Sequence, residues 1–77
     1  MKIMKLSDIK QDGSAVLESI DKIEEKKQKR LLELGFVEGT KIKVLKKSKG
    51  LLLIGVRGYS IALDKEITDK INVWRNV

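Results

Sequence analysis

Residues 29–44 read KRLLELGFVEGTKIKV, and they contain the sharpest change of pattern in the chain. Leu31 and Leu34 are three residues apart, as on one face of a helix, whereas residues 40–44 alternate as a half-buried strand does. Between the two patterns Gly35 can end a helix in left-handed backbone, and Phe36 can then fold back on Leu31. The segment therefore predicts a helix that stops at Gly35 and a strand that begins near Thr40.

Towards the N-terminus, the pattern predicts this helix over about Lys22–Leu34 and a strand before it over Ser14–Ile20. Asp21 can cap the helix, and Glu24 completes a capping-box-like pair with it. Residues 6–13 are interpreted as a lead-in that ends in an Asp-Gly turn. On a helical wheel the residues that share the core face are Ile23, Leu31 and Leu34.

Towards the C-terminus, short strands are predicted over 40–46, 51–56, 59–63 and 71–75, with a helical turn over 64–70. Arg57-Gly58 is interpreted as a hairpin turn, because Gly58 supplies a positive φ. The result is a mainly β fold of five strands, with one helix after the first strand and a helical turn before the last, closed into a small barrel. The predicted core consists of Val16, Ile20, Leu34, Ile42, Val44, Ile54, Val56, Ile61, Leu63, Ile71 and Val73.

The composition favours a binding protein over an enzyme. The 77 residues are assigned to a single domain, 1–77, and they include neither cysteine nor histidine. The commonest transition-metal ligands and the commonest general base are therefore missing. Glu24, Glu25 and Glu33 have lysine neighbours, which indicates a solvated, ion-paired helix face. We expect no catalytic group, no cofactor and no metal site.

No segment has the length of a membrane span. The longest apolar run covers residues 51–56, whereas a transmembrane helix needs roughly 20 apolar residues. Residues 1–6 lack the apolar core of a signal peptide. The sequence therefore predicts a cytoplasmic location.

The formal net charge is +6, and five lysines form a stripe with no acid between them. Such a stripe can follow the phosphates of a nucleic acid. The stripe can equally be the solvent-exposed face of a strand together with the loop after that strand, since no aromatic residue lies among these lysines for base stacking. Both interpretations stay open at this point for Lys41, Lys43, Lys46, Lys47 and Lys49.

Four apolar residues fall outside the predicted core and are candidates for a partner-binding surface. Leu32 lies on the polar side of the helix, and Leu51 and Leu53 lie on the strand face opposite to the core. Trp74 is out of phase with Ile71 and Val73. Whether the four form one patch depends on the fold.

Three segments resemble the FeoA (ferrous iron transport protein A) family: Leu6–Ile9 followed by Gly13, residues 29–44, and residues 56–63 followed by 71–73. A proline that often precedes the first glycine in that family is here Asp12. The resemblance implies an SH3-like barrel, a cytoplasmic role in ferrous iron uptake, and the membrane transporter FeoB as partner, with no catalytic residues. The alternatives are a small basic β-barrel that binds nucleic acid, and a stand-alone regulatory domain related to the C-terminal domain of metal-dependent repressors. The sequence is also compatible with a homo-oligomer.

Overall fold

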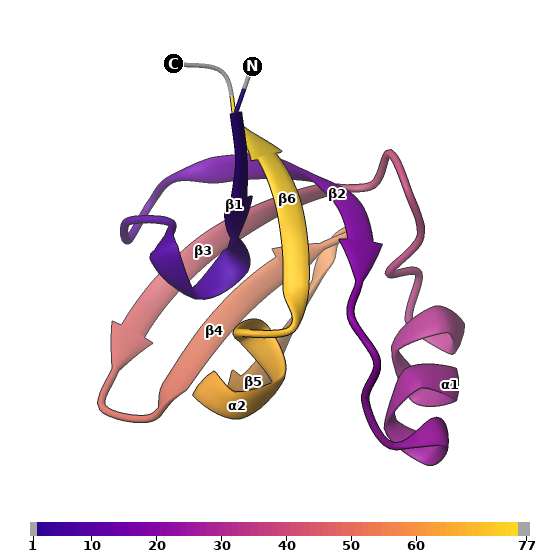
Figure 1. Cartoon of the computed structure of the whole chain (residues 1–77). Helices are drawn as coiled ribbons and strands as arrows, with labels where there is room; N and C mark the ends of the chain where they lie inside the picture. The colour runs from indigo at the N-terminus through magenta and orange to yellow at the C-terminus, as the bar shows by residue number, and fades with distance from the viewer. Residues whose placement is uncertain (1, 76–77) are drawn as a thin grey trace.

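Six antiparallel strands form one sheet in the computed structural model, which describes residues 2–75 (Figure 1). Their order across the sheet is β1-β6-β2-β3-β4-β5. The sheet curls, so that β1 and β6 cross in front of β3 and β4 in the view of Figure 1. The predicted mainly β fold is confirmed. The strands are β1 (Lys2–Lys5), β2 (Ser14–Ile20), β3 (Lys41–Ser48), β4 (Leu51–Val56), β5 (Tyr59–Asp64) and β6 (Ile71–Arg75).

The prediction of five strands is wrong, because it misses β1. This strand has four residues and carries a lysine at each end, so its sequence shows little alternation. It pairs with β6, with Lys2 opposite Arg75 and Ile3 opposite Trp74. The lysines also suit an edge strand, since charge at an edge discourages pairing with another chain.

Three short helices connect the strands: η1 (Leu6–Asp8, a 3-10 turn), α1 (Glu25–Glu33) and α2 (Lys65–Thr68). The N-cap of α1 is Glu24, which makes no side-chain cap hydrogen bond. The predicted cap, Asp21, instead accepts hydrogen bonds from Lys5 and Asn72. The predicted capping pair is therefore wrong, because partners in neighbouring strands take up the Asp21 carboxylate.

The predicted end of α1 is confirmed. The N–H of Gly35 donates to the Leu32 carbonyl and that of Phe36 to the Leu31 carbonyl, each at 3.0 Å, which is the Schellman arrangement. Phe36 is fully buried. The Thr40 hydroxyl then donates to the Gly35 carbonyl at 2.9 Å. Residues 29–44 thus bring the chain from α1 back into the sheet.

One buried cluster fills the inside of the curled sheet. The predicted core residues of β3, β4 and β6 are buried, whereas Leu34 and Ile61 are partly buried and pack against the cluster. The prediction for β2 is wrong in part: the buried residues are Ala15 and Leu17, and Val16 faces outward. A bulge after Leu17 adds one residue, so Leu17 and Ile20 both face the core. The burial of Leu31 agrees with its predicted place on the core face of the helix, and Phe36 and Leu52 are buried as well. The core residues that the sequence did not predict at all are Leu6, Ile9 and Ile67.

Gly35 and Gly39 both have left-handed backbone, with φ of +96° and +91°, but their surroundings differ. A Cβ on Gly35 would lie 2.6 Å from Cδ of Arg57, whereas one on Gly39 would meet no atom within 4 Å. We expect Gly39→Ala to cost only the left-handed strain of about 1–2 kcal/mol. Gly35→Ala carries the same strain and must also displace the flexible Arg57 side chain, so it should cost slightly more in a urea denaturation curve.

Arg57→Ala separates the strain at Gly35 from the crowding. In the Arg57→Ala background, Gly35→Ala should destabilise the protein no more than Gly39→Ala does, because the crowding atoms are gone. Equal losses of stability in Gly35→Ala and Gly39→Ala in the wild-type background would show that the Arg57 side chain moves aside at no cost.

Candidate interaction surface

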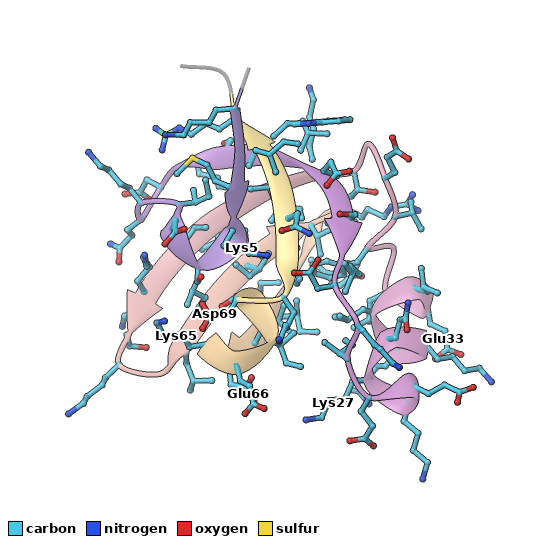
Figure 2. All side chains as sticks on the ribbon, viewed as in Figure 1. Lys5, Lys27, Glu33, Lys65, Glu66 and Asp69 are labelled. Carbon is cyan, nitrogen blue, oxygen red and sulfur yellow. The ribbon has the colours of Figure 1, made fainter. Side chains whose placement is uncertain are left out.

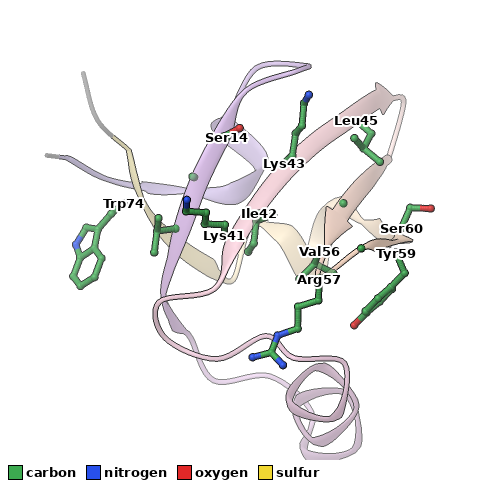
Figure 3. A pocket seen from close by; sticks show the side chains of 14 residues that line it. Ser14, Lys41, Ile42, Lys43, Leu45, Val56, Arg57, Tyr59, Ser60 and Trp74 are labelled. Atoms are coloured by element: carbon green, nitrogen blue, oxygen red, sulfur yellow. The ribbon is translucent and has the colours of Figure 1, made fainter.

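An open groove of about 930 Å³ crosses the face of the sheet that points away from the core. Strand register builds it, since Val16 lies beside both Lys41 and Trp74 in the sheet. In the next row Lys43 is opposite Gly55, which is opposite Ser60. Figure 3 shows Trp74 at one end of the groove and Tyr59 at the other, with Lys41 and Lys43 between them.

Gly55 and Leu45 shape the groove floor. The register of β3 against β4 shifts between Val44 and Lys46, which leaves Leu45 as the extra residue of a bulge. The Leu45 side chain bends over Gly55, where a Cβ would lie 3.3 Å from its Cδ1. The absence of a side chain at Gly55 therefore makes room for the Leu45 side chain, which forms this part of the floor.

The charges along the groove have one sign. Lys41, Lys43 and Arg57 line it, and none of the described residues that line it is Asp or Glu. Arg57 sits in left-handed backbone, with φ of 49°, and its side chain lies against Gly35 at the end of α1. A cation is favourable there because the carbonyl end of a helix is partly negative.

The four predicted partner-binding residues lie in three places. Leu51 and Leu53 are neighbours on the outer face of β4, 46% and 36% exposed. Trp74 lines the groove and is partly buried. Leu32 is 50% exposed on α1, beside a shallow hollow that Val37 and Ile20 also line. They do not form a single patch across the sheet, so each place is a separate candidate.

The lysine stripe is divided by the pleat of β3. Lys41 and Lys43 line the groove, and Lys46 lies opposite Leu53. Lys47 instead donates from Nζ to the Ser7 carbonyl at 2.9 Å, and its N–H donates to Gln11 at 3.0 Å. Part of the stripe therefore holds the N-terminal segment in place, and only part of it is offered to a partner.

Two carboxylates with lowered pKa values belong to structural contacts. Hydrogen bonds from Lys5 and Asn72 lower the pKa of Asp21 below its ordinary value of 3.8. The Ser7 hydroxyl, assisted by Lys65, does the same for the pKa of Asp69 (Figure 2). These contacts tie β1 and η1 to β6 and α2. They hold chain segments together, and neither carboxylate lines the groove.

Within residues 2–75 no three acidic side chains gather in a group that could hold a metal ion. Glu25 and Glu33 are exposed on α1. Over the same residues the structure has no helix that is long and apolar enough to cross a membrane.

Sequence reasoning found part of this surface and missed the rest. It singled out Trp74 and the stripe that contains Lys41 and Lys43. It missed Leu45 and Gly55, because the bulge at Leu45 leaves no mark in the sequence. A glycine within an apolar strand is the one signal that could have pointed to the packing of Leu45 over Gly55, since such a glycine often marks a close approach.

The model of the FeoA domain family matches residues 4–75. FeoA of Stenotrophomonas maltophilia, solved with zinc and described as a prokaryotic SH3 domain protein, is 31% identical, with a TM-score of 0.81 over 91% of this chain and 88% of that one. FeoA of Chlorobium tepidum is 29% identical, with a TM-score of 0.85 over 91% of this chain and 68% of that one. The predicted SH3-like fold is thereby confirmed.

A manganese-dependent transcriptional repressor has the same fold in part of its chain. Its TM-score is 0.86 at 13% identity, over 96% of this chain and 37% of the repressor. At that identity the likeness concerns the fold alone. No protein of curated function matches the sequence.

Proposed function

Because the chain belongs to the FeoA family, we propose that it is a non-enzymatic accessory protein of ferrous iron uptake, which acts in the cytoplasm by binding the membrane transporter FeoB. The family match over residues 4–75 is the observation that carries this proposal. The Stenotrophomonas maltophilia relative, at 31% identity, has itself been proposed as a ferrous iron transport activating factor.

The chemistry of the side chains supports binding over catalysis. A nucleophile needs a general base within hydrogen-bond reach, and the chain has no histidine to serve as one. The two carboxylates whose pKa values are lowered, Asp21 and Asp69, are held by Lys5 and Ser7 in contacts between strands and turns. A carboxylate with a lowered pKa is also a weaker base.

Leu32 is the apolar residue of α1 that is exposed and can contact a partner. It is 50% exposed, although its neighbour Leu31 is 3% exposed and packs in the core. Interface energy concentrates in a few apolar anchors. We therefore place one contact with FeoB at Leu32 and the hollow beside it, with Leu51, Leu53 and Trp74 as the other candidate contacts.

Leu32→Asp is expected to leave the thermal melt nearly unchanged and to abolish association with detergent-solubilised FeoB in a pull-down. The side chain is half in water already, so the charge costs the free protein little. In a complex the same charge would be buried against an apolar surface without a partner.

Lys70→Gln is the control for net charge, since Lys70 is exposed, lines neither the hollow beside Leu32 nor the groove, and the change of net charge is the same. It should bind FeoB as the wild type does. Undiminished binding by Leu32→Asp would remove α1 from the interface. No binding by the wild-type chain would count against FeoB as the partner.

A further inference from the structure

We infer that the groove across the outer face of the sheet is a binding site for an extended, acidic peptide segment that carries apolar side chains. This inference is independent of the surface on α1 and of the identity of the transporter. It starts from three features of the groove: the sign of its charges, its apolar floor and its length.

The charge of the groove selects an acidic occupant. Lys41 and Lys43 rise from the floor and Arg57 stands at one end, with no acidic side chain among the described residues that line the groove. Neither lysine makes an ion pair within residues 2–75. Their charges are therefore available to carboxylates, and complementary charge also speeds the encounter of the two partners.

The floor between the charges is apolar. Val16, Leu45 and Trp74 line the groove, and the Leu45 side chain lies over Gly55 in the middle. Leu45 and Trp74 are only partly buried in the free protein. An occupant that covered them would remove apolar surface from water, so the segment needs apolar side chains as well as carboxylates.

The length of the groove suits a short extended segment. It crosses from β6 over β2, β3 and β4 to the start of β5. Five strands at their usual spacing span about 19 Å, which about six residues of extended chain would cover. The hydroxyls of Ser14 and Ser60 lie along this path and can hydrogen-bond to the backbone of the segment.

Single-stranded RNA fits the groove less well than a peptide does. Binding without sequence preference relies on aromatic rings on which successive bases stack. Here the aromatic residues stand at opposite ends, and the hydroxyl of Tyr59 is engaged by the Leu34 carbonyl. The other lining side chains near Lys41 and Lys43 include Val16 and Leu45, which offer no stacking surface for bases.

The test uses the whole chain and its single tryptophan, Trp74, as a reporter inside the groove. The probe is a short end-blocked peptide in which glutamates flank leucines, and the reference is the same peptide with glutamine in place of glutamate. We expect the glutamate peptide to change the Trp74 emission and to shift the amide signals of Lys41, Lys43, Gly55 and Ser60 in NMR spectra. The glutamine peptide should bind at least about tenfold more weakly.

Charge reversal locates the site. Lys41→Glu with Lys43→Glu should weaken the glutamate peptide about tenfold or more, and added salt should weaken it for the wild type. Lys22→Glu with Lys26→Glu makes the same change of charge at exposed positions outside the groove and should leave binding unchanged.

Three outcomes would overturn the inference. The first is equal binding of the two peptides, the second is shifts confined to residues outside the groove, and the third is tighter binding of an oligouridine than of the peptide. Loss of FeoB binding in Leu32→Asp with intact peptide binding would show that the two surfaces are separate.

Discussion

Leu31→Asp should leave the chain unfolded at room temperature. Leu31 is 3% exposed and belongs to the core cluster, and its carbonyl accepts the hydrogen bond of the buried Phe36. Removing the leucine costs about 2–5 kcal/mol, and burying a carboxylate without a partner costs several more. A domain of this size has roughly 4–12 kcal/mol of stability in total. Circular dichroism should show the loss of the β spectrum.

Leu32→Asp is the control for this prediction, because it places the same side chain one residue further along α1 at a position that is 50% exposed. It should melt within a few degrees of the wild type. The opposite order, with Leu32→Asp unfolded and Leu31→Asp folded, would mean that α1 is rotated about its axis and that Leu32 faces the sheet.

Ile54→Ala is expected to lower the free energy of unfolding by about 2–5 kcal/mol. Only Leu31→Asp should destabilise the protein more. Ile54 is fully buried in β4, opposite Val44 on one side and Ile61 on the other, so its removal leaves a cavity with little room to close. Urea denaturation, followed by the emission of Trp74, measures the loss. Far-ultraviolet circular dichroism of the same samples gives a second measure of unfolding.

Leu53→Ala is the matched variant on the other face of the same strand. Leu53 is 36% exposed, so its truncation should cost well under half as much as that of Ile54. Similar losses for the two variants would show that β4 is covered on both faces in solution, for instance by a second copy of the chain.

The sequence predicted what is decided by neighbours along the chain. The end of α1 follows from Gly35, Phe36 and Leu31, which lie within one turn of each other, and the structure has these contacts. The turn at Arg57-Gly58 is equally local, and both residues have positive φ. The strands β2 to β6 follow from local patterns of a few residues, which are a continuous apolar run in β4 and alternation of apolar side chains in β3 and β5.

What the sequence could not give depends on residues far apart. The Asp21 carboxylate could cap the nearby helix, and only the fold brings Lys5 and Asn72 to it. The bulge after Leu17 changes which side chains of β2 face inward, and either face was apolar enough to be chosen. The groove is lined by residues of five strands and of one hairpin turn, so no contiguous stretch of sequence shows a pattern that predicts it.

The pairing of β1 with β6 has a consequence for how such domains can be joined to others. Lys2 lies opposite Arg75, so the chain enters and leaves the sheet at one point (Figure 1). A domain whose two ends lie close together can be inserted into a loop of a host protein without distorting the structure on either side of that loop. It also tolerates circular permutation, in which the old ends are fused and new ones are cut elsewhere. The same fold accounts for about a third of the repressor chain and for most of the Stenotrophomonas maltophilia FeoA chain.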